Sequence, residues 1–102
     1  MEVTGIRRSR VEQILNAEDP EGLLALGAPP DEYRGEAEKI AAALRQWQRG
    51  TPGEPDIIAV LEAVWRDSFG PLSQEEMDKR SLAFRRIGQR ILKDLASGQR
   101  GK

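Results

Sequence analysis

Apolar residues recur at helical spacing along most of this chain. In residues 33–47, Tyr33, Ala37, Ile40, Leu44 and Trp47 follow one another at intervals of four, three, four and three. Because an α-helix turns once in about 3.6 residues, this spacing places all of them on one face. The pattern predicts amphipathic helices that each bury one side against the others.

Pro and Gly separate the first two predicted helices. The first helix is expected over residues 4–17, and the Asp19-Pro20-Glu21-Gly22 segment ends it, because Pro disfavours helix in the residue before it and Gly permits a positive φ. The apolar residues of 23–26 (Leu23, Leu24 and Leu26) are expected to form a short turn that caps the core. The second helix then runs as far as Gly50, with Asp31 expected to cap its start.

Two further helices are predicted in the second half of the chain. Asp56 is a suitable N-cap for the third, which Gly70 terminates. Ser73 and Glu76 have the spacing of a capping box, so a fourth helix is expected to continue unbroken to about Ala96.

The resulting fold class is all-α, because no alternating run or Asn-Gly hairpin signal indicates a strand. We predict a four-helix bundle or an orthogonal helical domain, with the short apolar turn between the first two helices. The chain has 102 residues, enough for one core. Residues 1–96 are expected to form this single domain and 97–102 a flexible tail. Five aromatic residues are assigned to the core: Tyr33, Trp47, Trp65, Phe69 and Phe84. As an alternative, three apolar residues lie outside the core and pair two chains: Phe69, Leu72 and Leu82.

The composition argues against catalysis. The chain has no cysteine and no histidine, so thiol nucleophiles, zinc–thiolate sites and imidazole proton transfer are all excluded. We therefore expect a protein that is not an enzyme, with no cofactor, no metal and no small-molecule substrate. Four acids offer the oxygen ligands that hard cations prefer, but they lack EF-hand spacing: Asp19, Asp31, Glu32 and Glu36. No secretory signal or bilayer-length apolar run is present, so a cytoplasmic location without membrane binding is predicted.

Charge is strongly polarised along the chain, although the net charge is only −1. Residues 11–38 hold eight acids against Arg34 alone, a local charge of −7. Residues 79–102 hold eight bases against Asp94, a local charge of +7. Two interpretations stay open. Either the two blocks pair within the molecule, or one of them is a docking surface for an oppositely charged partner.

The basic block provides an alternative function. Lys79, Arg86, Arg90 and Lys93 are expected on roughly one side of the last helix, an arrangement that suits contacts to nucleic-acid phosphates. Against it, the pI is low for a nucleic-acid binder, and no aromatic residues lie between the bases for stacking.

One motif resembles a known group of proteins. The Asp19-Pro20-Glu21-Gly22 turn follows an apolar helix, and Asp31-Glu32-Tyr33 opens the next one. This arrangement resembles the small helical YugE-like bacterial proteins and the similar immunity proteins of contact-dependent growth-inhibition systems, and it covers about a third of the chain. This chain has Glu18 where members of the group often have Trp, and Arg34 where they tend to have an acid. The resemblance implies neutralisation of a toxin by stoichiometric binding.

The same motif has a structural and a functional interpretation, which are compatible. In the structural one, Asp19 accepts backbone N–H bonds across its own turn, and Tyr33 lays its ring on this turn and bonds a backbone group through its hydroxyl. In the functional one, the helix-loop-helix corner formed by residues 18–36 binds a protein partner such as a basic toxin domain. The predicted partner-binding residues are Glu18, Asp19, Glu21, Asp31, Glu32, Tyr33 and Glu36.

Overall fold

The computed structural model describes residues 6–48 and 50–100 of the chain, with side chains described as far as Ser97. Within these ranges every regular element is a helix, which confirms the all-α class. The five helices are α1 (Arg8–Glu18), α2 (Arg34–Arg45), α3 (Glu54–Phe69), α4 (Gln74–Lys79) and α5 (Ser81–Arg100). In the described ranges no helix is long and apolar enough to cross a bilayer.

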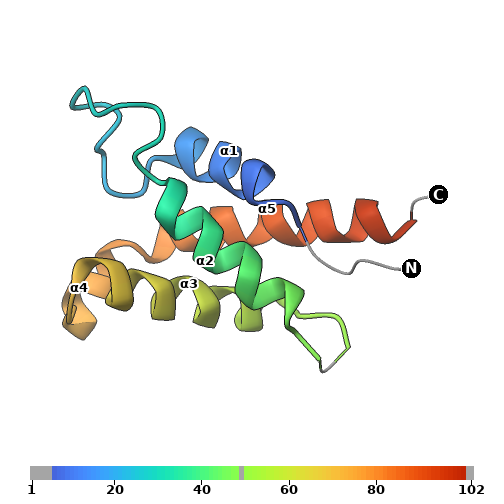
Figure 1. Cartoon of the computed structure of the whole chain (residues 1–102). Helices are drawn as coiled ribbons and strands as arrows, with labels where there is room; N and C mark the ends of the chain where they lie inside the picture. Colours follow the sequence, from blue (N-terminus) through green and yellow to red (C-terminus); the bar gives the residue numbers. More distant parts are fainter. Residues whose placement is uncertain (1–5, 49, 101–102) are drawn as a thin grey trace.

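Four of the helices pack as a closed ring. Helix α1 packs on α2, α2 on α3, α3 on α5 and α5 on α1, and these four contacts close the ring. Helix α4 packs beside α5. Figure 1 shows α2 passing in front of α5, between α1 and α3. The arrangement is a helical bundle with one short additional helix.

The core lies inside this ring and is built from the predicted helix faces. Its largest fully buried side chains are Trp65, Tyr33 and Phe84. The Trp65 ring lies 6.3 Å from that of Tyr33 in a stacked arrangement and 5.2 Å from that of Phe84 in an edge-on one. The buried apolar residues are Ile6, Val11, Ile14, Leu15, Tyr33, Ala37, Ile40, Ala41, Leu44, Ile57, Leu61, Val64, Trp65, Met77, Phe84, Ile87, Ile91 and Leu95.

The aromatic assignments need correction at two positions. Tyr33, Trp65 and Phe84 are buried as predicted, whereas Trp47 is half-buried and Phe69 is 38% exposed. Phe69 follows Trp65 by one helical turn and packs one side of its ring on it, at a centroid distance of 5.3 Å. The other side faces solvent because α3 ends there.

The alternative that placed three apolar residues outside the core is right in part. Phe69 and Leu82 are exposed, Leu82 by 57%, whereas Leu72 is half-buried and packs on the core. Pairing of chains through these residues stays a prediction.

The start of α1 and the end of α2 differ from the predicted bounds. The first helix begins at Arg8, and the predicted start at residue 4 lies outside the described residues. The second ends at Arg45 instead of near Gly50. The N–H of Trp47 bonds the carbonyl of Leu44 at 3.2 Å, a bond over three residues that tightens the last turn and ends the helix.

The start of α3 shows why Asp56 was misassigned. The N-cap is Gly53, three residues earlier, and the carboxylate of Asp56 reaches back to accept its backbone N–H at 2.8 Å. Pro55 fits the first turn because the N–H that it lacks has no intrahelical partner there.

The predicted fourth helix is divided in two. The capping box of Ser73 and Glu76 is present and starts α4, but the helix breaks at Arg80. The backbone N–H of Arg80 bonds the carbonyl of Met77, three residues back. The guanidinium group of Arg80 binds the carboxylate of Glu21 in the loop between α1 and α2. The following helix α5 extends to Arg100, beyond the predicted end at Ala96 and into the segment predicted to be a tail.

Candidate functional site

Asp19 and Tyr33 organise the loop between α1 and α2. Asp19 adopts a left-handed conformation, with φ of 44°. Its carboxylate accepts the backbone N–H groups of Leu24 at 3.1 Å and Ala25 at 3.0 Å, and the hydroxyl of Tyr33 at 2.7 Å. The Tyr33 oxygen in turn accepts the N–H of Glu21 at 3.0 Å. These contacts confirm the backbone bonds that the structural interpretation gave to Asp19 and to the Tyr33 hydroxyl.

The electrostatics of this pair follow from its hydrogen bonds. Burial alone would raise the pKa of Asp19, but the bonds from Tyr33 and from the backbone of Leu24 and Ala25 outweigh it and lower the pKa. Burial raises the pKa of Tyr33, and its bond to Asp19 raises it further. Near neutral pH the pair is therefore a carboxylate that accepts from a protonated phenol.

Glu21 forms a second anchor that connects this loop to the rest of the bundle. Its Oε2 accepts the Trp65 indole N–H at 2.6 Å and the Nε of Arg80 at 2.5 Å, while its Oε1 accepts Nη2 of Arg80 at 3.0 Å. Burial works against the charged form of Glu21, but Arg80 and Trp65 outweigh it and lower its pKa. The loop is thereby fixed to α3 and to the junction of α4 with α5. Sequence analysis did not assign Trp65 or Arg80 to the site.

The seven predicted partner-binding residues divide into two groups. Four serve contacts inside the molecule: Glu18, Asp19, Glu21 and Tyr33. The other three lie where α2 begins: Asp31 and Glu32 are exposed, and Glu36 is half-buried in the first turn. Among the described residues, the acidic side chains of the second group form neither an ion pair nor a side-chain hydrogen bond, whereas each acid of the first group forms at least one of these.

Asp31 does not cap α2 as predicted. The helix starts after Tyr33, and no side chain caps it. The backbone carbonyl of Asp31 accepts the N–H of Arg34 at 3.1 Å, so the chain makes a turn here before the helix begins. The buried ring of Tyr33 fixes the point of entry, and the carboxylate of Asp31 is left in solvent.

The loop tip carries the most exposed large apolar side chain of the described residues. Leu26 is 84% exposed, whereas Leu23 and Leu24 are half-buried and pack against the core. The prediction that all three cap the core is therefore wrong for Leu26. Asp19 holds the amides of Leu24 and Ala25, and this turn directs the next side chain outward. Figure 1 shows the loop projecting from the bundle beside α1.

The four predicted nucleic-acid contacts are all exposed. Lys79 lies on α4, and Arg86, Arg90 and Lys93 follow one face of α5 at helical spacing. Arg90 is partly committed, because its Nη1 bonds Glu18 at 3.2 Å. This contact and the Glu21–Arg80 pair join the acidic and basic blocks, so internal pairing is confirmed for part of the charge.

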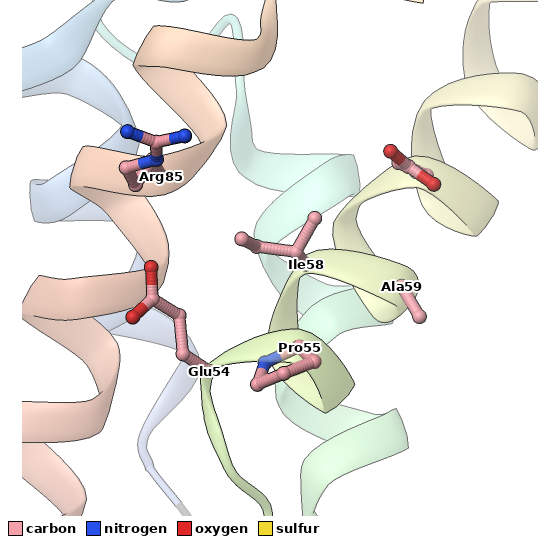
Figure 2. Close-up of a pocket in the computed structure, with 6 residues that line it drawn as sticks. Glu54, Pro55, Ile58, Ala59 and Arg85 are labelled. Atoms are coloured by element: carbon pink, nitrogen blue, oxygen red, sulfur yellow. The ribbon is translucent and has the colours of Figure 1, made fainter.

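Two concavities formed by described residues lie outside the loop between α1 and α2. A groove of about 430 Å³ runs between the start of α3 and α5 and is lined by Glu54, Pro55, Ile58, Ala59, Glu62 and Arg85. Figure 2 shows the carboxylate of Glu54 below Arg85, with Ile58 to the side of both on α3. A smaller pocket of about 280 Å³ lies between α1 and α5.

The acids of the corner do not converge on a common point. In the part of the chain that the structure describes, no group of three or more acidic, cysteine or histidine side chains is placed to hold a metal ion. Asp19 is engaged with its own loop and with Tyr33, whereas Asp31 and Glu32 face solvent.

Comparison with known proteins gives no match: no protein-family model, no curated protein and no solved structure is similar to this chain. The five helices alone define the class of the described chain, which is a small all-helical domain.

Proposed function

We propose that this chain is a non-catalytic, cytoplasmic domain that binds a protein partner through the loop between α1 and α2. The contact surface consists of Leu26, Asp31, Glu32 and Glu36. Of the seven residues that the sequence indicates, four support this surface from inside the molecule: Glu18, Asp19, Glu21 and Tyr33. The partner chemistry is an apolar pocket with Lys or Arg at its rim.

The exposure of Leu26 carries the proposal. Burying a leucine side chain contributes roughly 1.5–3 kcal/mol, so a partner that covers this tip gains that amount. The loop is held by Asp19, Tyr33 and a bond from Nδ2 of Asn16 to the carbonyl of Pro30 at 3.1 Å. A loop already fixed in one conformation loses little entropy when it binds.

The neighbouring acids supply the electrostatic part of the proposal. Asp31 and Glu32 are exposed in the same loop that carries Leu26, and exposed charges of one sign speed association with an oppositely charged partner. The resemblance to contact-dependent-inhibition immunity proteins makes neutralisation of a basic toxin by occlusion the specific form of this function.

The test is affinity purification from the native host, followed by binding measurements with the purified partner. Leu26→Ser combined with Asp31→Lys should weaken binding by about 100-fold, since both an apolar anchor and a charge contact are lost. The matched control is Leu82→Ser combined with Glu75→Lys, which changes another exposed leucine and another exposed acid. Equal affinities for the two double variants would contradict the proposed surface. A partner gene next to the gene for this chain would support the immunity function.

Nucleic-acid binding through the basic face is the second candidate. Lys79, Arg86 and Lys93 are exposed and form no ion pair within the described ranges. Such binding should weaken steeply with salt. A mobility shift with duplex DNA and with RNA at low and moderate salt tests it, and the absence of a shift at low salt would exclude it.

A further inference from the structure

The small pocket between α1 and α5 is lined entirely by polar and charged side chains. Its volume is about 280 Å³, and its lining residues are Arg10, Arg90, Lys93, Asp94 and Ser97. Pockets for drug-sized ligands span roughly 300–1,000 Å³, so this one suits a smaller group. Three bases against one acid favour an anion.

Two acids fix the positions of the arginines. Nε of Arg10 donates to Asp94 at 2.9 Å, and Nη1 of Arg90 donates to Glu18 at 3.2 Å. Arg10 also donates through Nη1 to Gln13 at 3.2 Å. Each guanidinium has five N–H donors, so both retain donors beyond these bonds.

These ion pairs leave the pocket positively charged. The side chains of Arg10 and Arg90 are 41% and 42% exposed. Ion pairs at such exposed positions contribute little stability. The two pairs therefore position the arginines and leave their charge at the surface. Lys93 and Ser97 are exposed on the same helix, and neither forms a side-chain bond within the described part of the chain. With Glu18 counted beside Asp94, the bases still exceed the acids by one.

We propose that this pocket binds a phosphate group. A phosphate dianion accepts several charge-assisted hydrogen bonds, and the planar fork of arginine matches two of its oxygens. Arg10 and Arg90 supply these forks, Lys93 adds an ammonium group, and Ser97 adds a hydroxyl. This site includes none of the four residues of the surface proposed for protein binding.

Arg86 distinguishes the two sources from which the phosphate can come. It lies one helical turn before Arg90 on the same face of α5 but does not line the pocket. A nucleic-acid strand with one phosphate in the pocket reaches Arg86 with a neighbouring one, whereas inorganic phosphate or a small phosphate ester does not.

The experiment is a titration of the full chain with inorganic phosphate at constant ionic strength. Binding is monitored by the amide chemical shifts in NMR spectra. Saturable shifts are expected around residues 10, 90, 93 and 97. Arg90→Gln combined with Lys93→Gln should weaken binding by about tenfold or more. Arg45→Gln combined with Arg66→Gln removes the same charge at two exposed positions outside the pocket and should change affinity by less than about twofold. Thermal unfolding without phosphate verifies that both variants fold.

Shifts that do not saturate, or equal weakening in the two double variants, would overturn the site, since both indicate general attraction of anions. The source is tested by adding a short single-stranded oligothymidylate to the phosphate-saturated protein. Displacement of phosphate that becomes weaker in Arg86→Gln identifies a nucleic-acid backbone. Retention of phosphate identifies a small phosphate ligand.

Discussion

The Tyr33 hydroxyl donates a hydrogen bond to the Asp19 carboxylate over 2.7 Å, across a sequence separation of 14 residues. Asp19 ends α1 and Tyr33 precedes α2, so this one bond links the exit of one helix to the entry of the next. The loop between them carries the exposed Leu26, and its conformation depends on the two side chains that hold its ends.

Tyr33→Phe should destabilise the protein by about 1–3 kcal/mol, because it removes the phenol bond to the Asp19 carboxylate and leaves the Glu21 N–H without its partner, while keeping the ring in the core. Urea unfolding measures this change. Amide exchange at Leu24 and Ala25 should accelerate in the variant, since Asp19 holds both amides. A variant with unchanged stability and unchanged exchange would show that the hydroxyl does not hold the loop.

Acid should unfold the protein partly through two carboxyl groups. Asp19 and Glu21 have pKa values lowered in the folded state, so their contribution to stability is complete above the unfolded pKa, near 4, and is lost as pH falls through the folded values. The free energy of unfolding should therefore decrease below about pH 4. Asp19→Asn combined with Glu21→Gln should flatten this decrease in urea melts at several pH values. Asp31→Asn combined with Glu32→Gln is the matched control, and an equal flattening there would contradict the assignment.

The helix faces could be predicted from the sequence because burial of one side requires a period of about 3.6 residues. Ile57, Leu61, Val64 and Trp65 show this period and are buried as expected. The break at Arg80 could not be predicted in the same way. It accompanies a contact between Arg80 and Glu21, which are 59 residues apart, and no local pattern encodes it.

The candidate site shows the same division between local and distant contacts. The Asp19 carboxylate binds the backbone amides of Leu24 and Ala25 within its own turn. Such local bonds could be predicted, because Asp in a turn commonly accepts nearby backbone N–H groups. The anchoring of Glu21 by Trp65 and Arg80 joins distant segments. The opposed charge blocks left open whether acids and bases pair within the molecule, and they did not indicate which residues would do so. The sequence does not distinguish Leu26 from Leu23 and Leu24, because all three are leucines. Only the backbone conformation of the turn directs the Leu26 side chain outward.

The Glu21–Arg80 pair should show a measurable coupling in a double-mutant cycle. With Glu21→Ala and Arg80→Ala we expect a coupling energy of about 1–2 kcal/mol, because the two side chains are only 14% and 20% exposed and make two hydrogen bonds. The matched pair is Lys39 and Asp67, whose side chains are 45% and 69% exposed. Its coupling should stay below about 1 kcal/mol. Equal couplings for the two pairs would show that Glu21 does not anchor the loop through Arg80.

Replacing two glycines by alanine should change the free energy of unfolding in opposite directions. Gly88 lies in the middle of α5, and an added Cβ would meet Cγ1 of Ile58 at 3.5 Å and Cγ2 of Ile57 at 3.8 Å, which are ordinary contacts. Gly88→Ala should therefore stabilise the protein by about 0.5–1 kcal/mol, since alanine loses less backbone entropy in a helix. Gly22 has φ of +69°, so Gly22→Ala should destabilise by about 1 kcal/mol although the space around it is open. Urea melts of both variants measure the two changes. A destabilising Gly88→Ala would mean that α3 and α5 approach more closely than these distances allow.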